Sequence, residues 1–400
     1  MPLPVLAMML CTFCVGTAES VIAGILPDIA DDVGVSLSTV GMLIGVYALV
    51  VVIAGPCLTA LTARLPRAVL LPCMMGVFVL GNVIAALAPG FGWLIAGRMV
   101  SALPHSTLIA VFVAAARDLA APGRQAASGA KVTLGIGLAT VVGVPAGTLL
   151  GDRWGWRATF WALAALSLLA TLMLLRHTVP EPTPAPASAP RPRASGRRRS
   201  FALPLPMLLT AVVIVLGTGG VFALYTYASP YLTQAAGYGS PTVTVLLWLY
   251  GLGGIAGNLL GARAADRHLR TAVLATLGSA TAALLLLVLL ADHAWAVAVL
   301  FCLLGAAYFA TIPALNTQIV ASAGPTSAAM ALTVNNSAFC IGIALGSWLG
   351  GAILAHDHDV TLVPAGGAAL TAAGLLLSTV TGRLLRTKPT TSDPHVPATV

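Results

Sequence analysis

Charged residues are scarce in this sequence. Asp, Glu, Lys and Arg make up 8% of the 400 residues, whereas a soluble domain carries about 25%. Hydrophobic residues make up 58%, which is more apolar surface than a water-soluble fold buries. This balance excludes an ordinary soluble protein and indicates an integral membrane protein. The formal net charge of +8 is therefore assigned to membrane topology, and no nucleic-acid partner is expected.

Motifs for catalysis and for ATP use are also missing. No glycine loop ends in the Lys that a nucleotide-binding loop requires, so ATP is not expected to drive the protein directly. We expect no enzymatic activity and no cofactor. The run His356-Asp357-His358-Asp359 contains metal-binding side chain types, but four adjacent polar residues in a turn are expected to be solvated, so no metal site is predicted.

Long apolar runs fill most of the chain. A helix that spans a bilayer needs about 20 mostly apolar residues, and twelve segments meet this requirement. The expected spans are Leu3–Leu26, Thr39–Ala60, Ala68–Ala88, Trp93–Ala116, Ser128–Leu150, Trp156–Arg176, Leu205–Ala228, Pro241–Ala262, Thr271–Ala291, Ala294–Val320, Ser327–Leu354 and Thr361–Gly382. The pattern predicts an all-α integral membrane fold with twelve transmembrane helices.

Polar sequence persists at one internal place, from Thr178 to Ser200, TVPEPTPAPASAPRPRASGRRRS. Pro and Ala favour extended backbone, and five Arg make the far end basic. We interpret residues 178–204 as a cytoplasmic linker between two six-helix bundles, 1–177 and 205–386. A lipid-headgroup or partner-binding role for the linker stays open. Residues 387–400 are expected to form a disordered cytoplasmic tail.

The distribution of basic residues predicts the orientation in the membrane. With the amino terminus in the cytoplasm, seventeen of the twenty Lys and Arg fall in cytoplasmic segments. The exceptions are Arg153 and Arg157 outside, and Arg98 within a span. Cytoplasmic loops of membrane proteins are rich in Lys and Arg, so both termini are expected in the cytoplasm.

The two halves repeat each other. Arg64 and Arg267 lie 203 residues apart, and so do Tyr47 and Tyr250 (267−64 and 250−47). Six spans that repeat in the same orientation are typical of a transporter whose substrate site lies between the halves. The repeat therefore predicts two pseudo-symmetric bundles around one central site.

Three stretches carry a family resemblance. Gly143–Trp161, GVPAGTLLGDRWGWRATFW, resembles the fifth-helix motif of the twelve-helix drug:proton antiporter group of the major facilitator superfamily (MFS). Gly16–Ser36 and Ala96–Val111 are similar to the first and fourth helices of that group. The similarity is greatest to bacterial exporters of sugars, nucleosides or chloramphenicol-like drugs. It implies export by alternating access.

Ionisable side chains inside the expected spans are the strongest functional candidates, because each is costly in a bilayer. Glu19 is the only acidic residue well inside a span, and Arg98 lies at about the same depth, about 7 to 8 Å from the same end. We hypothesise that Glu19 couples transport to protons and that Arg98 tunes it. A fixed structural ion pair is the alternative. His105, near the middle of the fourth span, is a candidate relay or a neutral packed histidine.

Uncharged polar residues are candidates for the substrate site. They are Tyr47, Tyr225, Tyr227, Tyr250, Tyr308, Asn316, Asn335 and Asn336. The resemblance makes the first, fourth, seventh and tenth helices central, which favours Tyr225, Tyr227, Tyr308 and Asn316. Tyrosines near helix ends can instead belong to the interfacial aromatic belt.

The resemblance also names a candidate gate. Gly143, Pro145 and Gly147 place small residues and a proline together, so that a neighbouring helix can approach and the fifth helix can bend; close packing without motion is the alternative. The family carries an Asp-Arg pair between helices two and three, but residues 63–67 read ARLPR. The second half keeps Asp266-Arg267, so a charge latch is expected to depend on that copy.

We therefore predict a multi-pass protein of the bacterial plasma membrane that exports a small drug-like compound in exchange for protons. A sugar or nucleoside exporter or facilitator is the alternative within transport, and a non-transporting receptor with the same fold is the alternative outside it. The expected partners are the small-molecule substrate, protons and the lipid bilayer, and the chain is expected to act as a monomer.

Overall fold

The computed structural model describes residues 3–62, 64–121, 125–176, 203–323, 328–356 and 359–384, and every regular element in these ranges is a helix. The first half contains α1 (Leu3–Ser20), α2 (Ile22–Val33), α3 (Leu37–Thr62), α4 (Arg67–Ala86), α5 (Phe91–Ala102), α6 (His105–Asp118), α7 (Gln125–Leu138), the π-helix η1 (Ala139–Gly143), α8 (Val144–Trp154) and α9 (Trp156–Arg176). The second half contains α10 (Leu205–Thr226), α11 (Ala228–Pro230), η2 (Tyr231–Ala235), α12 (Ser240–Leu289), α13 (Ala294–Ser322), α14 (Ala328–Ala355), η3 (Val360–Leu362) and α15 (Val363–Leu384). The predicted all-α fold is confirmed.

Eleven helices within the described ranges are long and apolar enough to cross a membrane. The difference from the twelve expected spans lies in α12, a 50-residue helix that contains 241–262 and all but the last two residues of 271–291. A straight helix of that length would measure about 75 Å, more than twice the hydrocarbon core of a bilayer. At His268 its backbone leaves the helical region (φ −146°, ψ 78°). The Tyr231 hydroxyl, just ahead of α12, donates to the carbonyl of Leu287 near its end (2.6 Å). Both ends of α12 therefore lie on the same side, and the chain turns at His268.

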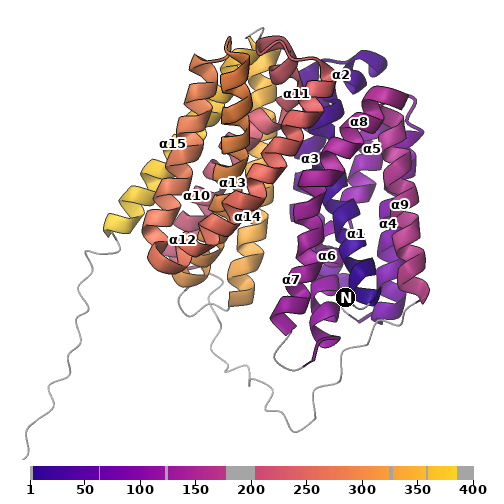
Figure 1. Ribbon diagram of the computed structural model, residues 1–400. Coiled ribbons are helices and arrows are strands. Elements are labelled where there is room, and N and C mark those ends of the chain that lie inside the picture. The colour runs from indigo at the N-terminus through magenta and orange to yellow at the C-terminus, as the bar shows by residue number, and fades with distance from the viewer. Residues whose placement is uncertain are drawn as a thin grey trace, which may run out of the picture.

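Two groups of helices stand side by side in Figure 1, α1 to α9 in one and α10 to α15 in the other. They meet where α3 packs against α14 and α2 against α11. We call the end that holds α2 and α11 the α2 end. The opposite end, where α1 begins and α9 ends, is called the N-terminal end (Figure 1).

The outer surface of the bundle is apolar. On α3, Leu61 is 81% exposed and Ile53 is 69% exposed. Trp154 ends α8 and Trp295 follows the first residue of α13, and both indole rings are exposed, as is typical of membrane–water interfaces. A surface of this kind is suited to lipid contact, so the chain is a multi-pass membrane protein.

Glycines allow α12 and α13 to pack at backbone distance. A Cβ at Gly257 would lie 2.0 Å from the carbonyl oxygen of Ala306, and a Cβ at Gly261 would lie 2.4 Å from that of Ala310. Both pairs are spaced by four residues, so one face of α12 lies flat against one face of α13. This close packing fixes the wall that carries the second half of the site.

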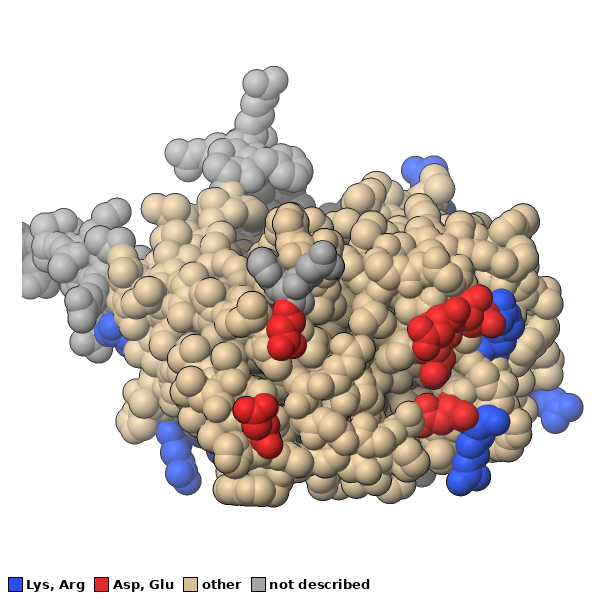
Figure 2. All heavy atoms as spheres, turned by 90° about the horizontal axis from the view of Figure 1, so that it is seen from above, with Lys and Arg blue, Asp and Glu red and all other residues tan. Residues whose placement is uncertain are grey.

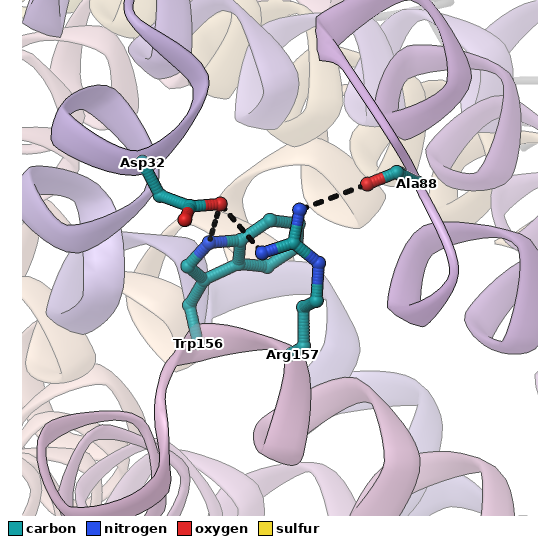
Figure 3. A network of polar contacts seen from close by, with 4 residues as sticks. All are labelled: Asp32, Ala88, Trp156 and Arg157. Atoms are coloured by element: carbon teal, nitrogen blue, oxygen red, sulfur yellow. Dashed lines mark hydrogen bonds and ion pairs between the residues drawn. The ribbon is translucent and has the colours of Figure 1, made fainter.

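Polar contacts fasten the first half at its α2 end (Figure 3). Asp32 Oδ2 accepts hydrogen bonds from Trp156 Nε1 (3.1 Å) and from Arg157 (2.5 Å). Arg157 also donates to the carbonyl of Ala88 (3.0 Å) and lies 4.3 Å over the ring of Trp156. The two hydrogen bonds hold the pKa of Asp32 below its usual value, because they stabilise the carboxylate. The network joins α2, α9 and the segment after α4.

Acidic side chains gather on the same face, which Figure 2 views from the α2 end. Burial, followed by the nearby carboxylates of Asp152 and Asp31, raises the pKa of Asp28. At the opposite end, Arg64 lies in the turn between α3 and α4, and Arg67 is the first residue of α4. This asymmetry follows the expected distribution of charge, and the orientation in the membrane stays a prediction.

Several predictions concern residues outside the described ranges. They include the linker up to residue 202, the tail 387–400, and Asp357 and His358 of the His-Asp run. The boundaries proposed for the two bundles and the linker, 1–177, 178–204 and 205–386, stay predictions.

Candidate functional site

A cavity of about 720 Å³ lies between the two halves. The first half lines it through α1, α6, α7 and η1, and the second half through α12, α13 and α14. Ala130 and Thr133, near the start of α7, belong to the lining, so the cavity extends toward the N-terminal end. Its volume is suited to a small organic molecule. Six of the residues predicted from the sequence line it, namely Glu19, His105, Tyr308, Asn316, Asn335 and Asn336.

Glu19 lies at a break in the first expected span. The helix α1 ends at Ser20 and α2 begins at Ile22. The last carbonyls of a helix lack intrahelical N–H partners. Arg98, from α5, supplies donors to them: its guanidinium donates to the carbonyl of Ala18 (2.5 Å) and to that of Glu19 (3.4 Å). Arg98 therefore caps α1 and fixes the backbone from which the Glu19 side chain reaches the cavity.

Arg98 is fully buried, and its Nε has no hydrogen-bond partner among the described residues. Its guanidinium carbon lies 4.3 Å from the centre of the Tyr47 ring, a cation–π contact. The ion pairs found in the described ranges are Arg67–Asp118 and Arg157–Asp32, so the Glu19 carboxylate is not directly paired with Arg98. The expected meeting of the two residues occurs through the main chain.

His105 begins α6 directly after Pro104 and lines the cavity. Its Nδ1 lies 3.1 Å from the Tyr47 hydroxyl, with the two rings edge to face. Tyr47 is fully buried and is not part of the described lining, so it lies behind His105 and contacts both His105 and Arg98. These contacts connect the imidazole to the capped end of α1.

The second half presents amide side chains to the cavity. Asn335 donates from Nδ2 to Asn316 Oδ1 (2.7 Å), which joins α14 to α13. Asn336 lies beside them in the lining, and Asn258 of α12 donates to the carbonyl of Phe309 (3.4 Å). The sequence-based selection missed Asn258. Its signal was available, because it is an isolated amide within the expected span 241–262.

Tyr225 and Tyr250, both predicted to line the cavity, belong to an aromatic cluster behind the described lining. Their ring centres lie 4.9 Å apart, and Tyr250 lies 5.1 Å from Phe301. Tyr308 and Phe309 line the cavity and lie 5.3 Å apart. In this conformation Tyr225 and Tyr250 support the wall that carries Tyr308.

Tyr227 lies away from the cavity, in the contact that joins the halves at the α2 end. Its hydroxyl donates to the carbonyl of Ser347 on α14 (3.1 Å) and lies 3.4 Å from that of Ser38 on α3. A Cβ at Gly41 of α3 would lie 2.0 Å from this hydroxyl, and a Cβ at Gly350 of α14 would lie 2.6 Å from the ring. Tyr227 therefore fills a socket made by glycines of both halves. The structure places it in the closure of the α2 end, because the glycines that accommodate its ring lie there.

The candidate gate in the fifth span contains a π-helical turn. The turn η1 ends at Gly143, and Pro145 follows it without an N–H to donate to the carbonyl of Val141. A Cβ at Gly143 would lie 1.9 Å from Thr17 Oγ1, and a Cβ at Gly147 would lie 2.4 Å from Val21. The irregular turn thus packs directly against the break in the first span. Its role in gating stays a prediction.

The charged residues proposed as a latch lie at the N-terminal end. Asp266 and Arg267 are exposed and directly precede His268, where α12 turns. The ion pair found at this end is in the first half, between Arg67 of α4 and Asp118 of α6 (2.7 Å). Arg67 thus has a carboxylate partner although the 63–67 stretch lacks an acid.

Comparisons with known proteins give relatives along nearly the whole chain. Residues 8–347 match the profile of the Major Facilitator Superfamily. The chain is 35% identical over 376 residues to the MFS-type transporter YfhI of Bacillus subtilis, covering 94% of this chain and 93% of that protein. It is 34% identical to the inner membrane transport protein YdhP of Escherichia coli, with 95% and 96% covered. It is 33% identical to a chloramphenicol resistance protein of Streptomyces lividans, with 89% and 90% covered.

Solved structures share the fold. A bacterial homologue of the human lysosomal transporter Spinster, in an inward-facing and unoccupied conformation, superposes with a TM-score of 0.71 at 17% identity, covering 95% of both chains. The peptide transporter POT in complex with sulfate gives a TM-score of 0.72 at 13% identity, with 96% of this chain and 95% of that chain covered. At these identities the likeness concerns the fold.

Proposed function

Because this chain belongs to the major facilitator superfamily, whose members move small molecules across membranes, we propose that it exports a small organic compound from a bacterial cell in exchange for protons. The observation that carries the proposal is Glu19, a carboxylate within a membrane span that opens into the cavity shared by both halves. Charged groups inside a bilayer are costly, so each one is a candidate for a functional role. The chloramphenicol resistance relative supports the direction of transport.

Proton coupling is proposed to depend on Glu19 and its fixed surroundings. A deprotonated Glu19 is a hydrogen-bond acceptor for cargo, and a proton that reaches it from the opposite side of the membrane removes that interaction. Arg98 keeps the carboxylate in place by capping α1 and adds a buried positive charge nearby. Tyr47 links Arg98 to His105, so a change of charge at His105 acts on the same site.

Alternating access is proposed to follow from the contacts at the α2 end. The cavity extends to the N-terminal end, and the halves are joined at the other end by Tyr227 in its glycine socket. If basic loops face the cytoplasm, this conformation is open to the cytoplasm. Rocking of the halves about the cavity, with bending at η1 and Pro145, would expose Glu19 to the opposite side.

The first test is proton exchange in inverted membrane vesicles. We expect chloramphenicol to dissipate a preformed pH gradient with the native chain and not with Glu19→Gln, because the amide cannot carry the proton. The matched control is Asp292→Asn, since Asp292 is an exposed acid outside the cavity. It should behave like the native chain.

Other outcomes distinguish the alternatives. Proton exchange that occurs only with uridine or lactose would identify a nucleoside or sugar exporter. Transport of a compound without proton movement would indicate a facilitator. Exchange that persists in Glu19→Gln would contradict the role of Glu19, and no response to any of the three compounds would leave the receptor alternative.

A further inference from the structure

The cavity is divided chemically between the two halves. The Glu19 carboxylate and the His105 imidazole come from the first half. Within the described lining, the second half contributes no Asp, Glu, Lys, Arg or His. Most of its polar groups are neutral amides, those of Asn258, Asn316, Asn335 and Asn336, and the others are the Tyr308 hydroxyl and the Cys340 thiol. The groups that can exchange protons therefore lie on one wall of the cavity, and the amide side chains lie on the other.

Asn335 has an acceptor without a partner. The side chain is 7% exposed, and its Oδ1 receives no hydrogen bond from a described residue. Its Nδ2 is engaged by Asn316 Oδ1 at 2.7 Å, so the orientation of the amide is fixed. A buried acceptor left without a donor is unfavourable, and a solute that donates to it regains that free energy. Because Asn335 lines the cavity, this buried acceptor lies in the wall of the space that a solute enters.

Asn316 complements this acceptor with a donor. Its Oδ1 accepts from Asn335, and a primary amide keeps two N–H groups for donation. The pair therefore combines an acceptor on Asn335 with a donor group on Asn316, on two amides that are joined by a hydrogen bond. Phe309 and Phe339, in the same lining, add flat apolar surface.

We propose that the Asn316–Asn335 pair selects the cargo, and that the cargo is an uncharged molecule with an adjacent hydrogen-bond donor and acceptor on a flat apolar body. Amides and vicinal hydroxyls have this arrangement. A charged group placed against the second half would lose hydration without gaining a counter-charge on that wall, so the amide pair itself favours uncharged groups. This inference rests on the export function proposed above.

The test is calorimetric binding to the purified full-length protein in detergent, which does not depend on proton coupling. The probes are chloramphenicol and uridine, both uncharged with donors and acceptors, and tetraphenylphosphonium, an aromatic cation without donors. We expect at least one uncharged probe to bind and tetraphenylphosphonium not to displace it. Asn335→Leu should weaken that binding about tenfold or more, as loss of a buried hydrogen bond does.

Asn82→Leu is the matched control, because it replaces a buried amide of α4 outside the cavity. It should leave the affinity unchanged. Thermal melting establishes whether each variant is folded. If Asn335→Leu is not folded, Asn316→Leu is used in the binding measurement in its place. Tighter binding of tetraphenylphosphonium than of either uncharged probe, no binding of either uncharged probe, or full affinity in the folded leucine variant would overturn the proposal. If the vesicles export a cation and neither uncharged probe binds, the proposed cargo selection is wrong while the proposed export function stands.

Discussion

Arg98 shows how one side chain can stabilise an interruption in a membrane-spanning helix. Where a helix is interrupted inside a bilayer, carbonyl groups are left without hydrogen-bond donors, because water cannot reach them. The planar guanidinium of Arg98 satisfies two of them at once and stacks on Tyr47. The break at Val21 thus persists beside the carboxylate that it positions.

Replacing Arg98 with Met should destabilise the protein and abolish proton exchange. Met fills part of the space but leaves the carbonyls of Ala18 and Glu19 without donors, at a cost of about 1–3 kcal/mol for each unsatisfied group. Arg98→Lys restores the charge without the two-pronged geometry and should be intermediate. The measurement is the melting temperature in detergent, together with exchange in vesicles.

Arg153→Met is the control for this comparison, because Arg153 is exposed near the end of α8. It should melt at the native temperature. If Arg98→Met melts at the same temperature as Arg153→Met, the capping role of Arg98 is contradicted.

The sequence predicted the depth of Glu19 and Arg98 but not the way they meet. Equal distances from the span ends gave the depth. The main-chain contact requires the interruption of the helix at Val21. The sequence did not predict this interruption, because residue 21 is neither proline nor glycine. Tyr47 lies between Arg98 and His105 because α3 packs against α5 and α6. The sequence alone does not predict this packing.

At the scale of helices, the closure of the α2 end depends on how α3, α10 and α14 fit together. Tyr227 of the segment after α10 occupies space that Gly41 and Gly350 leave free. The hydroxyl contacts backbone of both halves. A small change of side chain volume at this point should therefore act on the equilibrium between conformations rather than on cargo contacts.

Gly41→Ala should favour the conformation that is open at the α2 end, because the new Cβ would lie 2.0 Å from the Tyr227 hydroxyl. Spin labels at Ser36→Cys and Ala355→Cys, both exposed near this end, report the separation of the halves on a cysteine-free background. We expect the distance distribution to shift to longer values in Gly41→Ala. The further change Tyr227→Ala removes the obstacle and should restore the shorter distance.

Gly76→Ala is the matched control, because a Cβ there meets nothing within 4 Å. Its distance distribution should equal that of the native glycine. A Gly41→Ala protein that keeps the short distance would show that Tyr227 does not set the closure.

Apolar run length predicted the spans well, and α12 shows where it could not predict helix ends. The expected boundary between 262 and 271 contains no proline, so the helical backbone continues as far as His268 before the chain turns. The π turn η1 was likewise not predicted, although Pro145 pointed to a bend. Tyr227 was assigned to the substrate site because the resemblance makes the seventh helix central, and the sequence of that span does not indicate which of its residues meet the other half.

At the scale of the whole molecule, the cavity is proposed to be reached from the cytoplasm. Thr133→Cys places a thiol on an exposed part of the lining near the start of α7. On a cysteine-free background, a membrane-impermeant maleimide should label it in inverted vesicles and not in right-side-out vesicles. A bound cargo should slow the labelling.

Ser36→Cys, near the α2 end, serves as the opposite reference and should be labelled in right-side-out vesicles only. Labelling of both positions from one side would contradict the proposed topology. The repeat of 203 residues indicated two halves around one site, but a repeat is equally compatible with either open conformation. The direction of opening required the contacts of Tyr227 and the extent of the cavity.

The presence of one carboxylate in the described cavity lining has an energetic consequence. If one proton enters on Glu19 for each uncharged molecule that leaves, every cycle moves one positive charge inward. Export is then driven by membrane voltage as well as by the pH gradient, with about 2.3 kcal/mol for each 100 mV. The pump would continue to work in an alkaline medium, where the pH gradient vanishes, as long as the cell interior stays electrically negative.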